Sequence, residues 1–239
     1  MFVFLYLPDF MHLQIYKELY KEKDKGRAEK DKRYHKYEGF RSLGVGAPKR
    51  NSILKSYNRK IKEAECKEVL LSSRKLYLHG IEEAVLAANF LLKKRIDCVN
   101  HSFLEEISDH LCSWSTVDDF CIGVLQPLLL KNPRKTISLL RKWNKSRNMW
   151  KRRSSVVVFT RSIGESGEFT DEALSLCERL IWDKEDMVQK GVGWCLKDIM
   201  RGEKEKVLSY IENLKERGVS STITLYALRD TKKKGILSK

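Results

Sequence analysis

The stretch IEEAVLAANFLLKKRI, residues 81–96, repeats apolar residues at helical spacing, and HSFLEEISDHLC follows it at residues 101–112. Apolar side chains three and four positions apart share one face of a helix, so both stretches predict helices that bury that face. Strand signals are nearly absent: no Asn-Gly or Asp-Gly turn joins alternating runs, and VVVF at 156–159 is the only β-like tetrapeptide. The chain is therefore expected to be all-α.

Helical patterns continue to the C-terminal end of the chain, separated by short breaks. Pro133 lies near a first helical turn, where its missing N–H costs nothing, and Gly218 closes the stretch EKVLSYIENLKERG. Short joins imply that successive helices are antiparallel neighbours. We expect an α-solenoid of antiparallel HEAT-like helix pairs, forming a single domain over residues 1–239. Within it, residues 1–36 form an N-terminal helical segment whose lysine-rich part is either solvated or in contact with a partner.

The chain is strongly basic, with 47 Lys and Arg against 32 Asp and Glu and a formal net charge of +15. Residues 131–161 alone carry eleven Lys and Arg, and no Asp or Glu occurs between Phe120 and Gly164. A polyanionic partner is expected, and a polynucleotide is the first candidate because neutralising its phosphates releases counterions. From charge alone, the alternative is a soluble basic protein without such a partner.

The six cysteines form no Cys-x-x-Cys pair and no cluster with histidine along the sequence. Cys121 and Cys195 fall within apolar helical patterns, which favours reduced core thiols over a disulfide or a metal site. We therefore predict neither a metal ion nor a cofactor.

The opening stretch MFVFLYLPDF is apolar, but it has no basic segment ahead of it and its run stops at Pro8. It is too short for a signal peptide or a membrane span. The other apolar run, FCIGVLQPLLL, is interrupted by Gln126 and Pro127. The protein is therefore expected in the cytoplasm, away from membranes, and a monomer is expected for this architecture.

The stretch SWSTVDDF, residues 113–120, places a tryptophan and two aspartates at the edge of the most cationic segment. Thr116 and Asp119 match a capping box, in which each side chain accepts a backbone N–H at the start of a helix. Capping then explains Asp119 and leaves Asp118 in the first turn, where the helix dipole and nearby cations should keep it ionised. An ionised aspartate is suited to stabilising a developing cation or orienting a water molecule. The alternative is that both aspartates only cap the helix.

A second tryptophan, Trp150, precedes Arg153 by three residues, so both should lie on one face of a helix. The basic run at residues 151–153 is expected at the surface in contact with phosphate, because unpaired buried arginines are very costly.

A third tryptophan, Trp194, follows glycines at positions 191 and 193 in the stretch KGVGWCLKDI. Glycine inside a helix is unfavourable, so its presence indicates a close approach to that surface. The approaching group is either a ligand or a neighbouring helix packed around a core tryptophan.

The motifs SWSTVDDF, NMWKRRSSVVVF and VQKGVGWCLKDIM, in this order in an all-helical chain, resemble the DNA alkylation repair glycosylases of the AlkD-like group. The resemblance extends upstream to KRYHKYEGFRSLGVGAPKR, where the family has an aromatic residue ahead of a Phe-x-x-Gly-Val/Ile turn, and it covers roughly residues 30–230. It implies a superhelix of HEAT-like repeats whose concave, basic face holds double-stranded DNA, and so an association with the nucleoid. The long lysine-rich segment at residues 17–36 departs from the family.

The resemblance also implies which residues form the site. The family's acid maps onto Asp118, the two aromatic residues that flank the lesion onto Trp114 and Trp194, and the backbone-binding arginine onto Arg153. A family tyrosine maps onto Tyr34, although its spacing to the turn is one residue longer here and a second tyrosine competes for the role. The candidates for DNA contact are Tyr34, Tyr37, Trp150, Lys151, Arg152, Arg147 and Lys190.

The implied function is excision of N3- and N7-alkylated purines, such as 3-methyladenine and 7-methylguanine, from duplex DNA in base-excision repair. Ordinary glycoside hydrolysis needs two carboxyl groups, one of which protonates the leaving group. An alkylated purine already carries a positive charge and leaves as a neutral base, so one ionised carboxylate can suffice. Two alternatives are a non-catalytic HEAT-like protein that binds damaged, bent or branched DNA, and an α-solenoid scaffold for protein partners, which would bind DNA weakly and with little dependence on salt.

Overall fold

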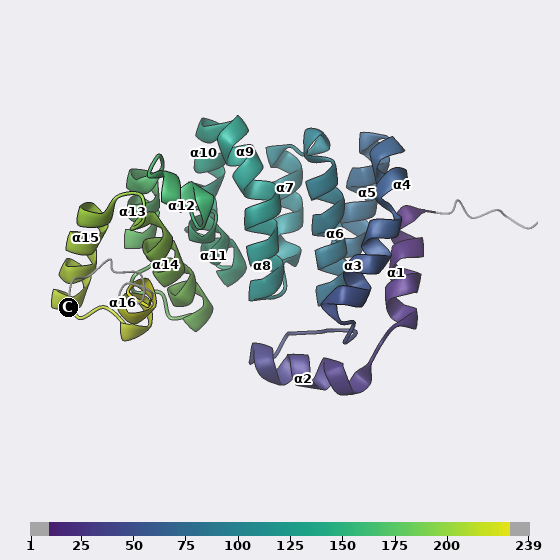
Figure 1. Ribbon diagram of the computed structural model, residues 1–239, viewed down its shortest axis with the longest axis horizontal. Helices are drawn as coiled ribbons and strands as arrows, with labels where there is room; N and C mark the ends of the chain where they lie inside the picture. The colour runs from purple at the N-terminus through teal and green to yellow at the C-terminus, as the bar shows by residue number, and fades with distance from the viewer. Residues whose placement is uncertain (1–9, 230–239) are drawn as a thin grey trace, which may run out of the picture. The chain divides into compact units, whose positions relative to one another are not determined.

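The computed structural model describes residues 10–229, which form helices and connecting turns without a strand (Figure 1). The predicted all-α solenoid of antiparallel helix pairs is confirmed. The chain divides into two compact units, one ending at Val124 and the other beginning at Leu125. The expectation of one domain over residues 1–239 stays a prediction, and all but the last residue of MFVFLYLPDF lies outside the described residues.

Residues 10–124 of the first unit contain eight α-helices, two short 3-10 helices and most of a π-helix. The α-helices are α1 (Met11–Lys21), α2 (Lys25–His35), α3 (Ala47–Ser56), α4 (Asn58–Glu63), α5 (Cys66–Tyr77), α6 (Glu82–Lys94), α7 (His101–Ile107) and α8 (Trp114–Phe120). The 3-10 helices are η1 (Ile96–Cys98) and η2 (Ser108–His110), and the π-helix is η3 (Cys121–Leu125).

The second unit continues with the same kind of helix pairs. Its described helices are α9 (Gln126–Lys131), α10 (Pro133–Trp143), α11 (Met149–Val157), α12 (Ser162–Ser166), α13 (Thr170–Glu178), α14 (Asp186–Ile199), α15 (Lys204–Glu216) and α16 (Ser221–Ala227). Pro133 occupies the first turn of α10, as predicted. The β-like stretch 156–159 forms the end of α11 and the beginning of the turn that follows it, not a strand.

Helix α6, the helix predicted from residues 81–96, is the centre of the first unit. It packs against α5 and α8 and also contacts α1, α3 and α4. Apolar residues on nearly all its sides, from Ala84 to Leu92, are buried. Three polar residues of the same helix are also buried, namely Glu82, Glu83 and Asn89. A buried polar group is costly unless it is hydrogen-bonded, so these three side chains need partners on neighbouring elements.

The apolar run after α8 does not continue as one α-helix. Pro127 lacks an N–H, and in an α-helix its ring would clash with the carbonyl of the residue four positions earlier. The chain widens into the π-helix η3 just ahead of this proline and resumes as α9, with Pro127 in its first turn. A single-turn π segment of this kind absorbs a break in the hydrogen-bond ladder.

None of the helices within residues 10–229 is both long and apolar enough to cross a membrane.

The cysteines differ from the prediction of reduced thiols. Cys121 and Cys195 are free and buried as expected, but Cys66 and Cys98 form a disulfide between α5 and η1. The two cysteines are 32 residues apart in the sequence, so no local pattern indicates the pair.

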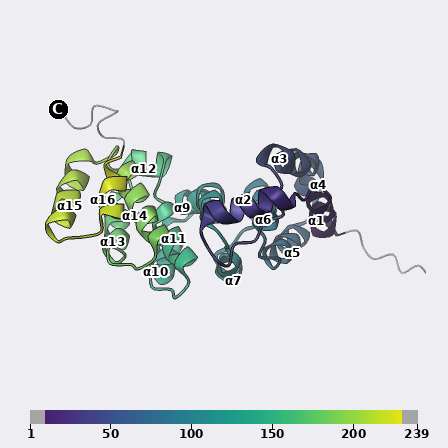
Figure 2. The ribbon, with the colours of Figure 1, turned by 90° about the horizontal axis from the view of Figure 1, so that it is seen from below.

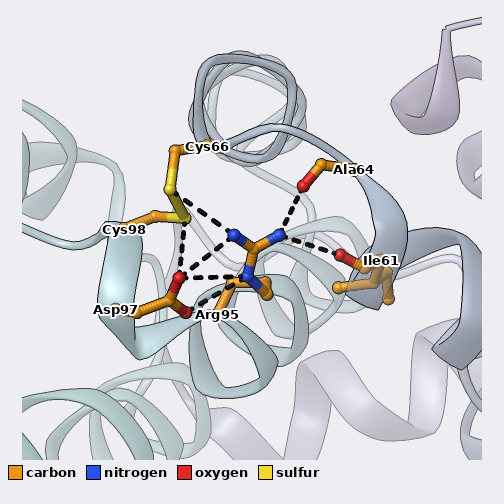
Figure 3. Close-up of a disulfide and its surroundings, with 6 residues drawn as sticks. All are labelled: Ile61, Ala64, Cys66, Arg95, Asp97 and Cys98. Atoms are coloured by element: carbon orange, nitrogen blue, oxygen red, sulfur yellow. Dashed lines mark hydrogen bonds and ion pairs between the residues drawn. A yellow bond between two sulfur atoms is a disulfide. The ribbon is translucent and has the colours of Figure 1, made fainter.

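The Arg95 side chain organises the surroundings of this disulfide (Figure 3). Its guanidinium donates to the carbonyls of Ile61 and Ala64 at the end of α4, and to the Asp97 carboxylate at 3.0 Å. It therefore satisfies helix-end carbonyls that have no partner within their own helix. Asp97 and the two sulfur atoms lie close enough to hold a metal ion, but the disulfide occupies both sulfurs.

We expect the variant Cys66→Ser/Cys98→Ser to lose about 2–4 kcal/mol of unfolding free energy, because the disulfide closes a loop of 32 residues in the unfolded chain. Urea unfolding with and without dithiothreitol measures this loss. The reductant should destabilise the wild type and leave the double variant unchanged. Equal stability of wild type and double variant under oxidising conditions would contradict the expectation.

Candidate functional site

Helix α8 begins earlier than the sequence suggests, and this changes the environment of both aspartates. Its N-cap is Ser113, whose hydroxyl accepts the Thr116 N–H at 3.2 Å, while Thr116 Oγ1 accepts the Ser113 N–H at 3.1 Å. The predicted box of Thr116 and Asp119 is therefore wrong: the box is a Ser-x-x-Thr pair that lies one turn earlier and satisfies the N–H groups of Ser113 and Thr116. Asp118 becomes the fifth helical residue. It therefore lies beyond the first turn, and the stabilising effect of the helix dipole is confined to that turn.

Asp119 belongs to a hydrogen-bond network of the core rather than to a cap. Its carboxylate accepts the Asn89 amide at 3.0 Å and forms an ion pair with Lys93, both from α6. Asn89 also donates to the Thr116 carbonyl and accepts the hydroxyl of the buried Tyr77. Burial raises the pKa of Tyr77 well above its ordinary value, so this phenol remains a donor.

Gly123 in the π-helix makes room for the lysine of this network. A Cβ at Gly123 would lie 2.0 Å from Cε of Lys93 and 2.6 Å from its Cγ. The lysine side chain thus runs across the bare backbone at Gly123 to reach Asp119. The network holds α6, α8 and the π-helix in one register.

Trp114 and Asp118 lie four residues apart on α8, so they share a face, and both are half-buried. Aromatic residues from the segment of α2 and the turn after it surround the tryptophan. The Tyr34 ring meets Trp114 edge-on with ring centroids 6.0 Å apart, and His35 stacks on Trp114 at 5.1 Å. On its other side His35 stacks on Phe40 at 3.9 Å. The structure therefore brings together Trp114, Asp118 and Tyr34 within the first unit.

The first residue of α6, Glu82, ties this aromatic cluster to the start of α8. Its carboxylate accepts the hydroxyls of Ser113 and Ser115 and lies 3.5 Å from Nε2 of His35. Burial raises the pKa of Glu82, and burial lowers the pKa of His35. Both shifts favour the neutral forms, so desolvation outweighs the attraction between the two groups. The contact positions the His35 ring without a full ion pair.

The next residue, Glu83, fixes the turn that precedes α3. It is 2% exposed, and its carboxylate accepts the Ser42 hydroxyl at 2.8 Å and the N–H groups of Leu43 and Val45, each at 2.9 Å. Gly44 has φ +77°, and a Cβ there would lie 2.1 Å from the Asp24 carbonyl oxygen. This glycine thus lets the start of α2 approach the turn closely.

In the second unit, Arg153 is buried against α14 at 5% exposure. Its Nη1 donates to the Met187 carbonyl at 2.5 Å. A Cβ at Gly191 would lie 3.2 Å from Cγ of Arg153, so Gly191 provides the space for the arginine. Gly193 allows close packing of a neighbouring helix, as one of the two alternatives expected: a Cβ there would lie 2.7 Å from Cβ of Tyr226, where α16 packs on α14. Both glycines thus accommodate the protein's own groups.

Trp194 is half-buried on α14, and an arginine that the sequence did not single out lies over it. The guanidinium carbon of Arg161 is 5.7 Å from the centroid of the indole. Arg161 is exposed and has φ +55° and ψ −135°, a backbone conformation that is strained for a residue other than glycine. The buried carboxylate of Asp198 holds it there by accepting the Arg161 N–H at 2.7 Å.

The basic run at residues 151–153 does not lie on the surface, which corrects the prediction. Lys151 is 6% exposed, and Arg152 is half-buried in a two-bond pair with Asp183 at 2.6 and 3.1 Å. Arg152 also donates to the carbonyls of Ser146 and Arg147. Trp150 is 4% exposed and belongs to the core. The Asp183 carboxylate that binds Arg152 lies 31 residues along the chain, and the other acceptors of this run are backbone carbonyls. The local sequence therefore gives no sign of these contacts.

The remaining candidates are more accessible. Arg147 is exposed, and Lys190 is half-buried and pairs with Asp186 at 2.7 Å. Tyr34 is 71% exposed and Tyr37 is 38% exposed, and Tyr34 is the one in contact with Trp114. Two exposed aromatic residues were missed: Tyr20, at 47% exposure on α1, and Trp182, at 62% exposure in the turn between α13 and α14. Trp182 directly follows the apolar pattern of α13, so the sequence gives no sign that it is exposed.

The two adjacent aspartates should differ in their effect on stability. We expect Asp119→Ala to lose about 2 kcal/mol of unfolding free energy, because it removes one of the two acceptors of the buried Asn89 amide and the ion-pair partner of Lys93. Asp118→Ala on the half-buried neighbouring position is the matched control and should lose less. Urea unfolding at pH 7 measures both, and equal losses would contradict the structural role of Asp119.

The strain at Arg161 predicts an inverted preference for glycine. Elsewhere alanine is usually the more stable of the two, but here Arg161→Gly should exceed Arg161→Ala by about 1 kcal/mol or more, since glycine adopts positive φ freely. Thermal unfolding of the two variants, side by side, tests this. Greater stability of the alanine variant would show that the backbone is not held in this conformation in solution.

Comparisons with known proteins agree with this architecture. The chain matches the family model of the DNA alkylation repair enzyme over residues 15–231. No curated protein is significantly similar to it in sequence. Its structure is similar to a predicted DNA alkylation repair enzyme from Enterococcus faecalis, with 16% identity and a TM-score of 0.71, over 87% of this chain and 95% of that chain. This likeness shows the fold.

A weaker likeness is found to Pseudomonas fluorescens alkylpurine DNA glycosylase AlkC bound to DNA containing an abasic site analog. It has 19% identity and a TM-score of 0.44, over 78% of this chain and 63% of that chain. The family model, in contrast, spans most of the chain, and the protein belongs to the DNA alkylation repair enzyme family.

Proposed function

We propose that the protein is a DNA glycosylase that excises N3- and N7-alkylated purines from duplex DNA by hydrolysis of the N-glycosidic bond. The observation that carries the proposal is the arrangement at α8, where Asp118 and Trp114 share one half-buried face and Tyr34 lies against the tryptophan. Membership in the DNA alkylation repair family supports DNA as the substrate. A monomer that acts in the cytoplasm at the nucleoid, without a cofactor, completes the proposal.

Asp118 is proposed to stabilise the cationic sugar. The bond between deoxyribose and base breaks with development of positive charge on the sugar, and a nearby carboxylate lowers the energy of that state. The same carboxylate can orient the water molecule that attacks the sugar. No proton donor is required, because the alkylated purine carries its positive charge into the bond-breaking step and leaves as a neutral base.

The exposure of the tryptophans supports the assignment of two of them to the substrate. Trp143 and Trp150 are 1% and 4% exposed and belong to the core, whereas Trp114 and Trp194 are half-buried and offer part of their indole to a ligand. An indole against deoxyribose excludes water and strengthens the effect of a nearby carboxylate. The exposed Arg161, which lies over Trp194, is the proposed contact to the phosphate backbone in the second unit, whereas the buried Arg153 supports α14 through the Met187 carbonyl.

We expect Asp118→Asn to lower the release of 7-methylguanine and 3-methyladenine from alkylated duplex DNA by about 100-fold or more, because it removes the stabilising charge and keeps the shape. Chromatography of the released bases under single-turnover conditions measures the rate. Affinity for the same duplex should persist in this variant. Asp119→Asn, assayed well below its unfolding temperature, is the control and should retain most of the activity.

Two outcomes would contradict the proposal. If the wild type binds alkylated DNA but releases no base, the protein recognises damaged or bent DNA without catalysis. If it binds DNA weakly and with little dependence on salt, a scaffold for protein partners becomes the better account.

A further inference from the structure

We propose that the exposed face of α2, in the lysine-rich N-terminal segment, is a phosphate-binding surface for duplex DNA beside Trp114. The proposal rests on the proposed function only in that it requires DNA as the partner. It assigns a role to a segment that the proposed site does not otherwise use. Three features of α2 support this role: its composition, its attachment to the first unit and the exposure of its side chains.

Helix α2 contributes almost nothing to the core. His35 is its only buried residue, so burial of apolar surface does not explain why the helix exists. From Lys25 to Lys36 the chain has six Lys and Arg against two acids, Glu29 and Asp31. One of these acids is engaged internally, since Asp31 accepts the Ser42 hydroxyl and pairs with Arg27 at 3.9 Å. The outer face of the helix is therefore strongly cationic.

The helix is nevertheless held firmly in place, at three points. At its start, the Asp24 N–H donates to the Leu43 carbonyl at 2.9 Å, next to the close approach at Gly44. At its middle, Asp31 shares the Ser42 hydroxyl with Glu83 of α6. At its end, the His35 ring is enclosed between those of Phe40 and Trp114. Figures 1 and 2 show α2 lying across the ends of the first unit's helices.

The exposed side chains of α2 suit a nucleic acid. Lys30 lies one turn ahead of Tyr34, and Arg33 is the residue directly before it. All three side chains are exposed, with Tyr34 at 71%. Within residues 10–229, no carboxylate pairs with Lys30 or Arg33, so both cations are available to phosphate. Eleven helical residues extend over about 16 Å, enough to follow several phosphates of one strand.

A membrane surface fits α2 less well than DNA. Helices that lie on membranes combine a cationic face with a broad apolar face, which inserts between the lipids. The only large apolar side chain on the exposed surface of α2 is Tyr34. That tyrosine touches Trp114, one turn from Asp118, so a duplex held along α2 would pass the residues proposed to act on it.

The test is the salt dependence of binding to an undamaged duplex, which is independent of base release. Each phosphate contact contributes about 0.9 to the slope of log K against log salt concentration. We expect Lys30→Gln/Arg33→Gln to make the slope less steep by about 1–2. The charge-conserving variant Lys30→Arg/Arg33→Lys should keep the slope of the wild type. Circular dichroism confirms that each variant is folded, which is expected because neither side chain is buried.

The matched control removes two exposed lysines at the other end of the first unit. Lys67 is next to Cys66, whose disulfide joins it to the chain just after α6, whereas His35 contacts the start of α6. The 13 residues of α6 separate these ends by about 20 Å. Lys62→Gln/Lys67→Gln carries the same change in net charge and should leave the slope unchanged.

The outcomes separate this proposal from the proposed function. Steep salt dependence in the wild type, with the same slope in Lys30→Gln/Arg33→Gln, would overturn the role of α2 and leave the glycosylase proposal intact. Equal changes in the α2 variant and the Lys62→Gln/Lys67→Gln control would show an effect of net charge alone and also overturn it. Loss of binding to anionic phosphatidylserine vesicles, but not to DNA, in the α2 variant would assign the surface to a membrane instead.

Discussion

The first unit depends on how the buried polar side chains of α6 are satisfied. A carboxylate or amide removed from water is tolerated only with hydrogen-bond partners, and α6 buries three such groups among its apolar residues. Glu82 finds partners at the start of α8 and the end of α2, Glu83 in the turn before α3, and Asn89 in α5 and α8. The need to satisfy one helix thus fixes the elements that carry Tyr34, Trp114 and Asp118.

The second unit follows the same rule with charges of both signs. Arg153 is buried and donates to a backbone carbonyl of α14, Arg152 is paired with Asp183, and the Asp198 carboxylate holds the strained Arg161. Side chains held by several partners keep their positions when a ligand arrives, which lowers the entropic cost of binding. Of these residues, Arg161 is the one proposed to meet DNA, and its backbone is held by Asp198 before a ligand arrives.

The sequence predicts the helices well because their apolar periodicity is local. It fails where a residue's partner comes from a neighbouring helix pair: Asn89 and Asp119 are 30 residues apart, Arg152 and Asp183 are 31, and Cys66 and Cys98 are 32. These separations match the length of one helix pair, as a solenoid requires, since each pair contacts only its neighbours. The length of a repeat can be anticipated from the sequence. Which side chains meet across it depends on the rotation of each helix, and the three-residue shift of the cap from Thr116 to Ser113 shows how small a difference in the start of a helix changes the environment of an aspartate.

The two aspartates of α8 have different roles, one structural and one proposed to be catalytic, and this difference limits the chemistry that the proposed site can perform. The Asp119 carboxylate is committed to Lys93 and Asn89, so its charge is compensated and it cannot serve as a second catalytic carboxyl group. Within the proposed function, Asp118 then acts alone. A lone ionised carboxylate stabilises a cation but donates no proton, so a neutral purine, which must be protonated to leave, is a poor substrate. The pairing of Asp119 with α6 thus restricts the proposed reaction to bases whose alkylation has already supplied the positive charge.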